Sequence, residues 1–71
     1  MAYKITSKFV VAFLGNVNHK EVHEVARETR DCQITEILSA GHAVGFSPDS
    51  LAQAHKEGYD NCAYCIGGST R

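Results

Sequence analysis

Cys62-Ala63-Tyr64-Cys65, between Gly58-Tyr59 and Gly67-Gly68, is the stretch of this 71-residue chain that restricts its fold most. Two thiols that lie two residues apart in a tight turn can both bind one tetrahedral metal ion, at about 2.3 Å for each zinc–sulfur bond. Gly67 lies where backbone N–H groups can fold round and donate to the sulfurs, which stabilises the thiolate charge. The pair supplies half of a four-ligand site, so the other ligands must come from elsewhere in the chain.

A redox dithiol and a haem attachment site are the alternatives for this pair. Haem attachment needs a histidine directly after the second cysteine, and Ile66 stands there. A thioredoxin-type dithiol lies at the start of a helix, where the helix dipole lowers the pKa of the thiol. Here the pair follows a predicted helix C-terminus, so the sequence favours a metal-binding turn.

A chain this short usually needs stabilisation beyond its hydrophobic core, which a metal site can supply. A core of this size rarely contributes more than about 3–5 kcal/mol, and such chains usually add disulfides, a metal or a partner. Three cysteines are an odd number and the N-terminus lacks a secretory signal, so we expect reduced thiols in the cytoplasm. No apolar run approaches the roughly 20 residues of a membrane span. We therefore expect a single zinc-binding domain over residues 1–71, with its core at about 9–66 and a flexible tail over 67–71.

Cys32 is the cysteine outside the pair, and we predict that it is the third ligand, although a lone cysteine is often a small buried hydrophobic residue. The fourth ligand must be a histidine, a carboxylate or water. We assign it to His23, so that His23 and Cys32 form one half of the site and Cys62 and Cys65 the other. The remaining histidines fit ordinary places at a turn, a helix-to-strand junction and a helix C-terminus: His19, His42 and His55. The predicted cofactor is one Zn2+ ion in a closed Cys3His site, because four protein ligands leave no open position for catalysis.

The first half of the chain predicts one strand and one weaker element. Residues 9–14 are rich in β-branched and aromatic side chains, which predicts a buried strand, and Gly15-Asn16-Val17-Asn18 then predicts a turn. Residues 20–31 predict a weak amphipathic helix or an irregular loop with one inward face. Their apolar residues recur at helical spacing, at Val22, Val25 and Ala26.

The second half gives clearer signals. Helical spacing recurs at Ile34, Ile37 and Leu38. Gly41 follows as the expected C-cap of this short helix, and residues 42–46 alternate weakly as a second strand. Ser47-Pro48-Asp49 predicts a helix start with Ser47 as its N-cap, and Gly58 ends that helix. The expected fold is a small zinc-stabilised α+β domain with a short β-sheet of two or three strands and two or three short helices.

Several short motifs follow one another along the chain in an order that resembles the small Ada-type metal-binding module. That module is similar to the N-terminal zinc domain of the Ada alkyl-phosphotriester repair protein. The matching positions are Phe13-Leu14-Gly15-Asn16, Lys20-Glu21-Val22-His23, Cys32, Ile37, Phe46, Leu51, Ala54 and Gly58-Tyr59-x-x-Cys62-x-x-Cys65. The resemblance spans roughly residues 9–66. It implies that zinc is bound by His23, Cys32, Cys62 and Cys65. Basic residues common around the final pair in that family are replaced here by Asp60, Asn61, Ala63 and Tyr64.

The charge of the chain directs the functional hypotheses. Seven Lys and Arg against eight Asp and Glu give a net charge of −1, which is not typical of proteins that bind nucleic acid through phosphates over a broad face. We therefore expect a structural zinc module, not an enzyme, that binds another macromolecule, with a protein favoured over nucleic acid and no membrane.

Two alternatives stay open. The first is nucleic-acid binding by the basic residues, with Tyr59 or Tyr64 stacking on bases. Its basic residues are Lys4, Lys8, Lys20, Arg27 and Arg30. The second is a zinc thiolate that accepts an alkyl group, at Cys32, Cys62 or Cys65. Carboxylates that could supply a base in such chemistry are Glu21, Glu24, Glu28 and Glu36.

Overall fold

The computed structural model describes residues 2–63 and residue 66. Five short strands in this part of the chain form one mixed sheet in the order β1-β4-β2-β3-β5. The strands are β1 (Ala2–Lys4), β2 (Phe13–Asn16), β3 (Glu21–Glu24), β4 (Ala43–Phe46) and β5 (Asp60–Asn61). Neighbouring strands are antiparallel except β3 and β5, which run parallel.

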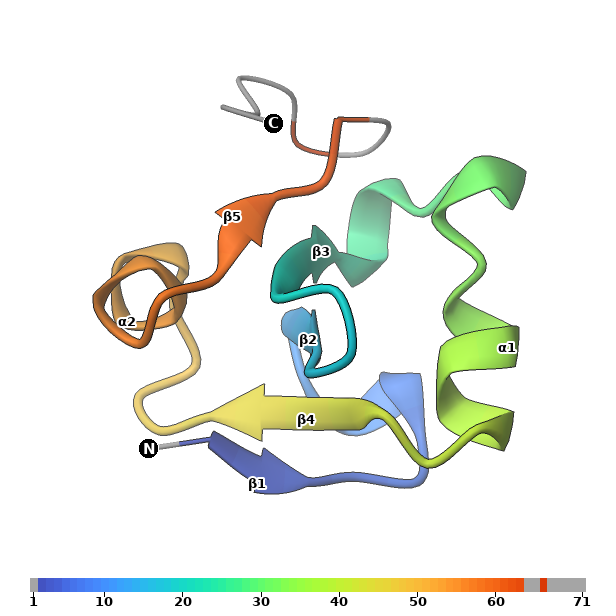
Figure 1. Cartoon of the computed structure of the whole chain (residues 1–71), viewed down its shortest axis with the longest axis horizontal. Coiled ribbons are helices and arrows are strands. Elements are labelled where there is room, and N and C mark those ends of the chain that lie inside the picture. Colours follow the sequence, from blue (N-terminus) through green and yellow to red (C-terminus); the bar gives the residue numbers. More distant parts are fainter. Residues whose placement is uncertain (1, 64–65, 67–71) are drawn as a thin grey trace.

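Two short α-helices cover opposite faces of this sheet, as Figure 1 shows. They are α1 (Ile34–Ser39) and α2 (Leu51–Lys56). Because successive strand residues point to opposite faces, the core divides in two. Leu14 and Ala43 pack with α1, whereas Val22 and Val44 pack in the cluster that includes α2. The result is a small compact α+β domain with a Cα radius of gyration of 10.4 Å.

The helix α1 confirms the prediction made from helical spacing. Ile34 and Ile37 are buried, and Gly41 follows the helix with a φ of +78°, a conformation that favours glycine. The predicted second strand is confirmed as β4, all of whose residues are buried.

The start of α2 differs from the prediction. Ser50, not Ser47, caps this helix, and its side chain accepts a hydrogen bond from the backbone N–H of Gln53. The Ser47–Pro48 peptide bond is cis. The Asp49 carboxylate accepts hydrogen bonds from the backbone N–H groups of Ala12 and Phe13, so this segment ties the chain to β2 before the helix begins.

The predicted strand at 9–14 is wrong in its position. Residues Lys8–Val10 form a 3-10 helix, in which Phe9 and Val10 are 85% and 68% exposed. The strand begins at Phe13 and continues through Gly15 and Asn16, which were predicted to lie in a turn. The Ser7 side chain caps the 3-10 helix by accepting a hydrogen bond from Phe9 N–H, which favours the turn over an extended segment.

Of the two alternatives for residues 20–31, the amphipathic helix is wrong, and the irregular loop does not include the strand that the structure shows. This segment forms β3 and two 3-10 helices, Val25–Arg27 and Arg30–Cys32. The sheet has five strands among the described residues instead of two or three, because β1, β3 and β5 pair through their backbones over too few residues to leave an alternating pattern.

The Glu57 carboxylate links the end of α2 to β1. It accepts hydrogen bonds from Gln53 Nε2 and from the backbone N–H of Ala2. The bond from Gln53, with a smaller contribution from Ala2, lowers the pKa of Glu57. No helix in the described part of the chain is long and apolar enough to cross a membrane.

Candidate metal centre

The first component of the centre is His23, which lies in the middle of β3. It pairs with Leu14 of β2, and the strand alternation turns its side chain away from the face that Val22 occupies. The side chain is 2% exposed and its Nε2 atom is buried. Burial lowers the pKa of His23, against the opposing effect of the nearby Glu21 and Glu28 carboxylates. The imidazole is therefore neutral near pH 7, which is the form that binds metal ions.

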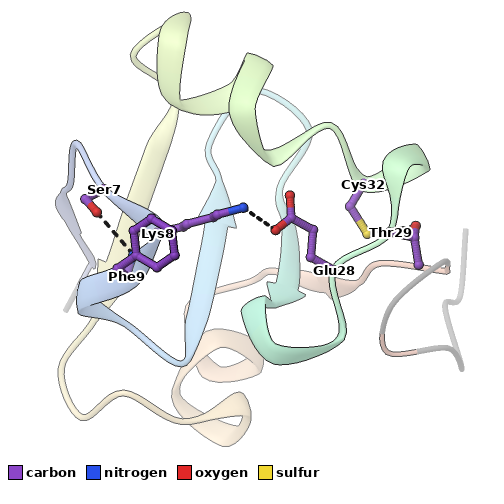
Figure 2. A network of polar contacts seen from close by, with 6 residues as sticks. All are labelled: Ser7, Lys8, Phe9, Glu28, Thr29 and Cys32. Atoms are coloured by element: carbon purple, nitrogen blue, oxygen red, sulfur yellow. Dashed lines mark hydrogen bonds and ion pairs between the residues drawn. The ribbon is translucent and has the colours of Figure 1, made fainter.

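Cys32 comes from the 3-10 helix that follows β3. Its backbone N–H donates to the Thr29 carbonyl at 3.1 Å, and its sulfur lies 3.6 Å from Thr29 Oγ1. An ion pair between Lys8 and Glu28 holds the chain just before this turn (Figure 2). The next residue, Gln33, has a φ of +55° and redirects the chain into α1. These contacts place the sulfur inward, where Cys32 is 3% exposed.

Cys62 lies near His23 and Cys32 although it comes from a later part of the chain, directly after β5. The strand β5 runs parallel to β3, and the Cys62 N–H extends this pairing by donating to the Val22 carbonyl at 2.9 Å. Cys62 is 2% exposed.

The three side chains form a compact donor set. The sulfurs of Cys32 and Cys62 are 3.6 Å apart, and one ligand atom from each of His23, Cys32 and Cys62 lies within 4.8 Å of the others. Two sulfurs bound at about 2.3 Å in a tetrahedral site lie roughly 3.8 Å apart, close to the observed separation. The cluster could therefore hold one metal ion. Thiolate and imidazole donors suit zinc better than calcium or magnesium, which prefer oxygen.

The other predicted ligands and candidate residues lie as follows. Cys65, the predicted fourth ligand, and Tyr64 are outside the described residues, as is the predicted tail at 67–71. His55 is on the α2 side, where its Nε2 lies 2.5 Å from Asn61 Oδ1. His19 and His42 are not part of the cluster, although both line the pocket beside it.

This pocket has a volume of about 450 Å³ and adjoins the cluster. The side chains of His23, Cys32 and Cys62 form part of its wall. Exposed residues that include Gln33 and Glu36 also line it, so it reaches the protein surface. Sequence reasoning did not find this pocket, because its walls come from segments that only the sheet topology brings together.

The residues proposed for nucleic-acid binding have contacts of their own. Lys8 pairs with Glu28, and Lys20 Nζ lies 4.7 Å from the centroid of the Tyr59 ring. Tyr59 is 5% exposed, and burial raises its pKa. Little of the Tyr59 ring is thus available for stacking on a base.

Comparisons of the chain with protein-family models, with curated proteins and with solved structures found no match.

Proposed function

We propose that this chain is a structural zinc-binding module that uses one Zn2+ ion to hold its fold and presents a surface to another macromolecule. The observation that carries the proposal is the buried contact of three candidate ligands from three separate segments: His23 in β3, Cys32 before α1 and Cys62 after β5. A metal ion bound there would connect two neighbouring strands at one edge of the sheet, β3 and β5, to the turn that leads into α1.

The burial of the ligands supports a structural role over catalysis. The three residues are only 2–3% exposed, and buried structural thiols react poorly with bulky reagents. An alkyl group carried on DNA would have to reach sulfurs that lie below the surface. Cys65 would complete a closed Cys3His site, as the resemblance to the Ada-type module implies. Both the resemblance and the role of Cys65 as the fourth ligand stay predictions.

The distribution of charge and apolar side chains supports a protein partner. The net charge is −1, and Lys8 and Lys20 already contact Glu28 and Tyr59. Phe9 and Val10, in contrast, are largely exposed on one 3-10 helix. Exposed apolar side chains of this kind are more useful to a protein interface than to phosphate recognition.

Native mass spectrometry of the purified protein tests the metal site. We expect one zinc ion in the wild type and weakened retention in both His23→Ala and Cys32→Ala. His55→Ala is the matched control, because His55 is exposed and lies outside the cluster, and it should retain the ion. Full retention without His23 would contradict the assigned ligand set, and absence of metal from the wild type would contradict the proposal.

Titration with a mixed oligonucleotide pool at low salt tests the choice of partner. We expect no binding. Salt-dependent binding would overturn the preference for a protein partner and favour the nucleic-acid alternative.

A further inference from the structure

The two described cysteines are close enough for a second kind of chemistry. Their sulfurs are 3.6 Å apart, and a disulfide would require an approach of roughly 1.6 Å to reach the ordinary S–S bond length. Each cysteine lies at the end of a short element, Cys32 at the end of a 3-10 helix and Cys62 just after the two-residue strand β5. Ends of this kind can shift more easily than the centre of a strand.

The pocket can admit a small reagent beside both cysteines. Cys32 and Cys62 line its wall, while Gln33 and Glu36 at its rim are exposed. A volume of about 450 Å³ accommodates a hydroperoxide easily. Because both cysteines are only 2–3% exposed, their burial disfavours attack on a group carried by a bulky molecule such as DNA more than attack on a small peroxide.

We propose that Cys32 and Cys62 form a redox pair, in which a hydroperoxide converts the two thiols into a disulfide and the disulfide prevents metal binding. The claim that the disulfide prevents metal binding rests on the proposed function. The claim that the two thiols form a disulfide does not. The pair differs from a dithiol made of Cys62 and Cys65, because it joins two segments 30 residues apart in sequence.

The chemistry balances with hydrogen peroxide as the oxidant. One thiolate attacks a peroxide oxygen, the O–O bond breaks, and a sulfenic acid forms as hydroxide leaves. The second thiolate attacks the sulfenic sulfur, the S–S bond forms, and a second hydroxide leaves. The two sulfurs lose two electrons, which reduce the peroxide to two hydroxide ions. The sulfurs joined in this way no longer offer two thiolates to a metal, so zinc binding should be lost until a dithiol reductant restores them.

Peptide mapping of the full chain, oxidised as purified and without chelator, tests the pairing. The protein is treated with hydrogen peroxide, its remaining thiols are alkylated, and it is digested with trypsin without reduction. Cys32 falls in peptide 31–56, and Cys62 and Cys65 both fall in peptide 57–71. We expect the two peptides to be joined in the wild type and in Cys65→Ser, with a mass loss of two hydrogen atoms. Cys62→Ser and Cys32→Ser should each lose most of the joined product.

A closed disulfide within peptide 57–71, with peptide 31–56 left alkylated, would overturn the proposal. So would Cys65→Ser that stays fully alkylated after oxidation. Should a variant fail to fold, the wild-type map still separates a Cys62–Cys65 disulfide from a link between the two peptides, and fragmentation of the joined product assigns that link to Cys62 or Cys65. The same protein in urea is a further control, since the unfolded chain should favour the neighbouring Cys62 and Cys65.

Zinc loading of the oxidised and re-reduced protein separates the two proposals. We expect no zinc in the oxidised protein and full binding after reduction by dithiothreitol. A joined product in a protein that never binds zinc would defeat the proposed function while leaving the redox pair intact. Zinc binding by a protein that forms no joined product would defeat the redox pair alone, and zinc binding by the oxidised protein would overturn the claim that disulfide and metal exclude each other.

Discussion

At the scale of single residues, the side chains packed around Gly15 leave no room for a Cβ atom at this position. A Cβ atom built there would lie 2.7 Å from Phe46 Cζ, 2.9 Å from Val44 Cγ2 and 3.0 Å from Tyr59 Cε2. Phe46 and Tyr59 pack edge to face, with their ring centroids 5.0 Å apart, directly against the backbone of β2. This glycine, which the sequence predicts to lie in a turn, instead allows two rings to pack onto the middle of the sheet.

The substitution Gly15→Ala should therefore destabilise the protein by about 1–3 kcal/mol, because the added methyl group overpacks the core. Urea denaturation monitored by circular dichroism measures this loss. Ser39→Ala on the exposed side of α1 is the control, with an expected change within about 0.5 kcal/mol. Equal midpoints for the two variants would show that the rings do not pack against Gly15.

At the scale of elements, Asp49 connects the loop before α2 to the start of β2. Its two carboxylate oxygens accept hydrogen bonds from the backbone N–H groups of Ala12 and Phe13, at 2.6 and 3.0 Å. We expect Asp49→Ala to lower the free energy of unfolding by about 1–2 kcal/mol, since it leaves two N–H donors without these bonds. Asp49→Asn retains one oxygen acceptor and should lose less. An unchanged unfolding midpoint in Asp49→Ala would contradict this role.

The elements that the sequence predicts well are those with strong local signals. Buried Ile34 and Ile37 followed by Gly41 identify α1, because helix packing and the glycine cap both act within a few residues. The helical alternative for residues 20–31 fails because Val22 and Val25 share helical spacing by coincidence. Val22 is buried in a strand that depends on pairing with β2 and β5, which is a non-local interaction.

The candidate site could be predicted in part for a similar reason. His23, Cys32 and Cys62 were predicted as ligands from the small number of suitable donors, and the structure brings them together. That they bind zinc stays a prediction, as does the role of Cys65, which lies outside the described residues. The Thr29 hydroxyl beside Cys32 and the adjoining pocket depend on the path of the 3-10 helices, for which the sequence holds no local signal.

At the scale of the whole molecule, metal removal should cost most of the stability. Structural zinc in small domains contributes on the order of 10 kcal/mol to folding, more than a core of this size supplies. We expect chelator-treated protein to lose its near-ultraviolet circular dichroism and to recover it when zinc is added back. Magnesium added in place of zinc is the control and should restore nothing. A chelated protein with an unchanged spectrum and melting temperature would show that the fold stands without the ion.

The parallel pairing of β5 with β3 also determines the point during synthesis at which this edge of the sheet and the His23, Cys32 and Cys62 cluster can form. Val22 cannot pair with β5 until Asn61 has been synthesised. Cys62 is synthesised 30 residues after Cys32. Until that point the edge of β3 that pairs with β5 is exposed, and Cys32 lacks Cys62 as its neighbour. The donor set of the proposed metal site is therefore incomplete until Cys62 has been synthesised, so the ion could be held there only after the segment that follows β5 has been made.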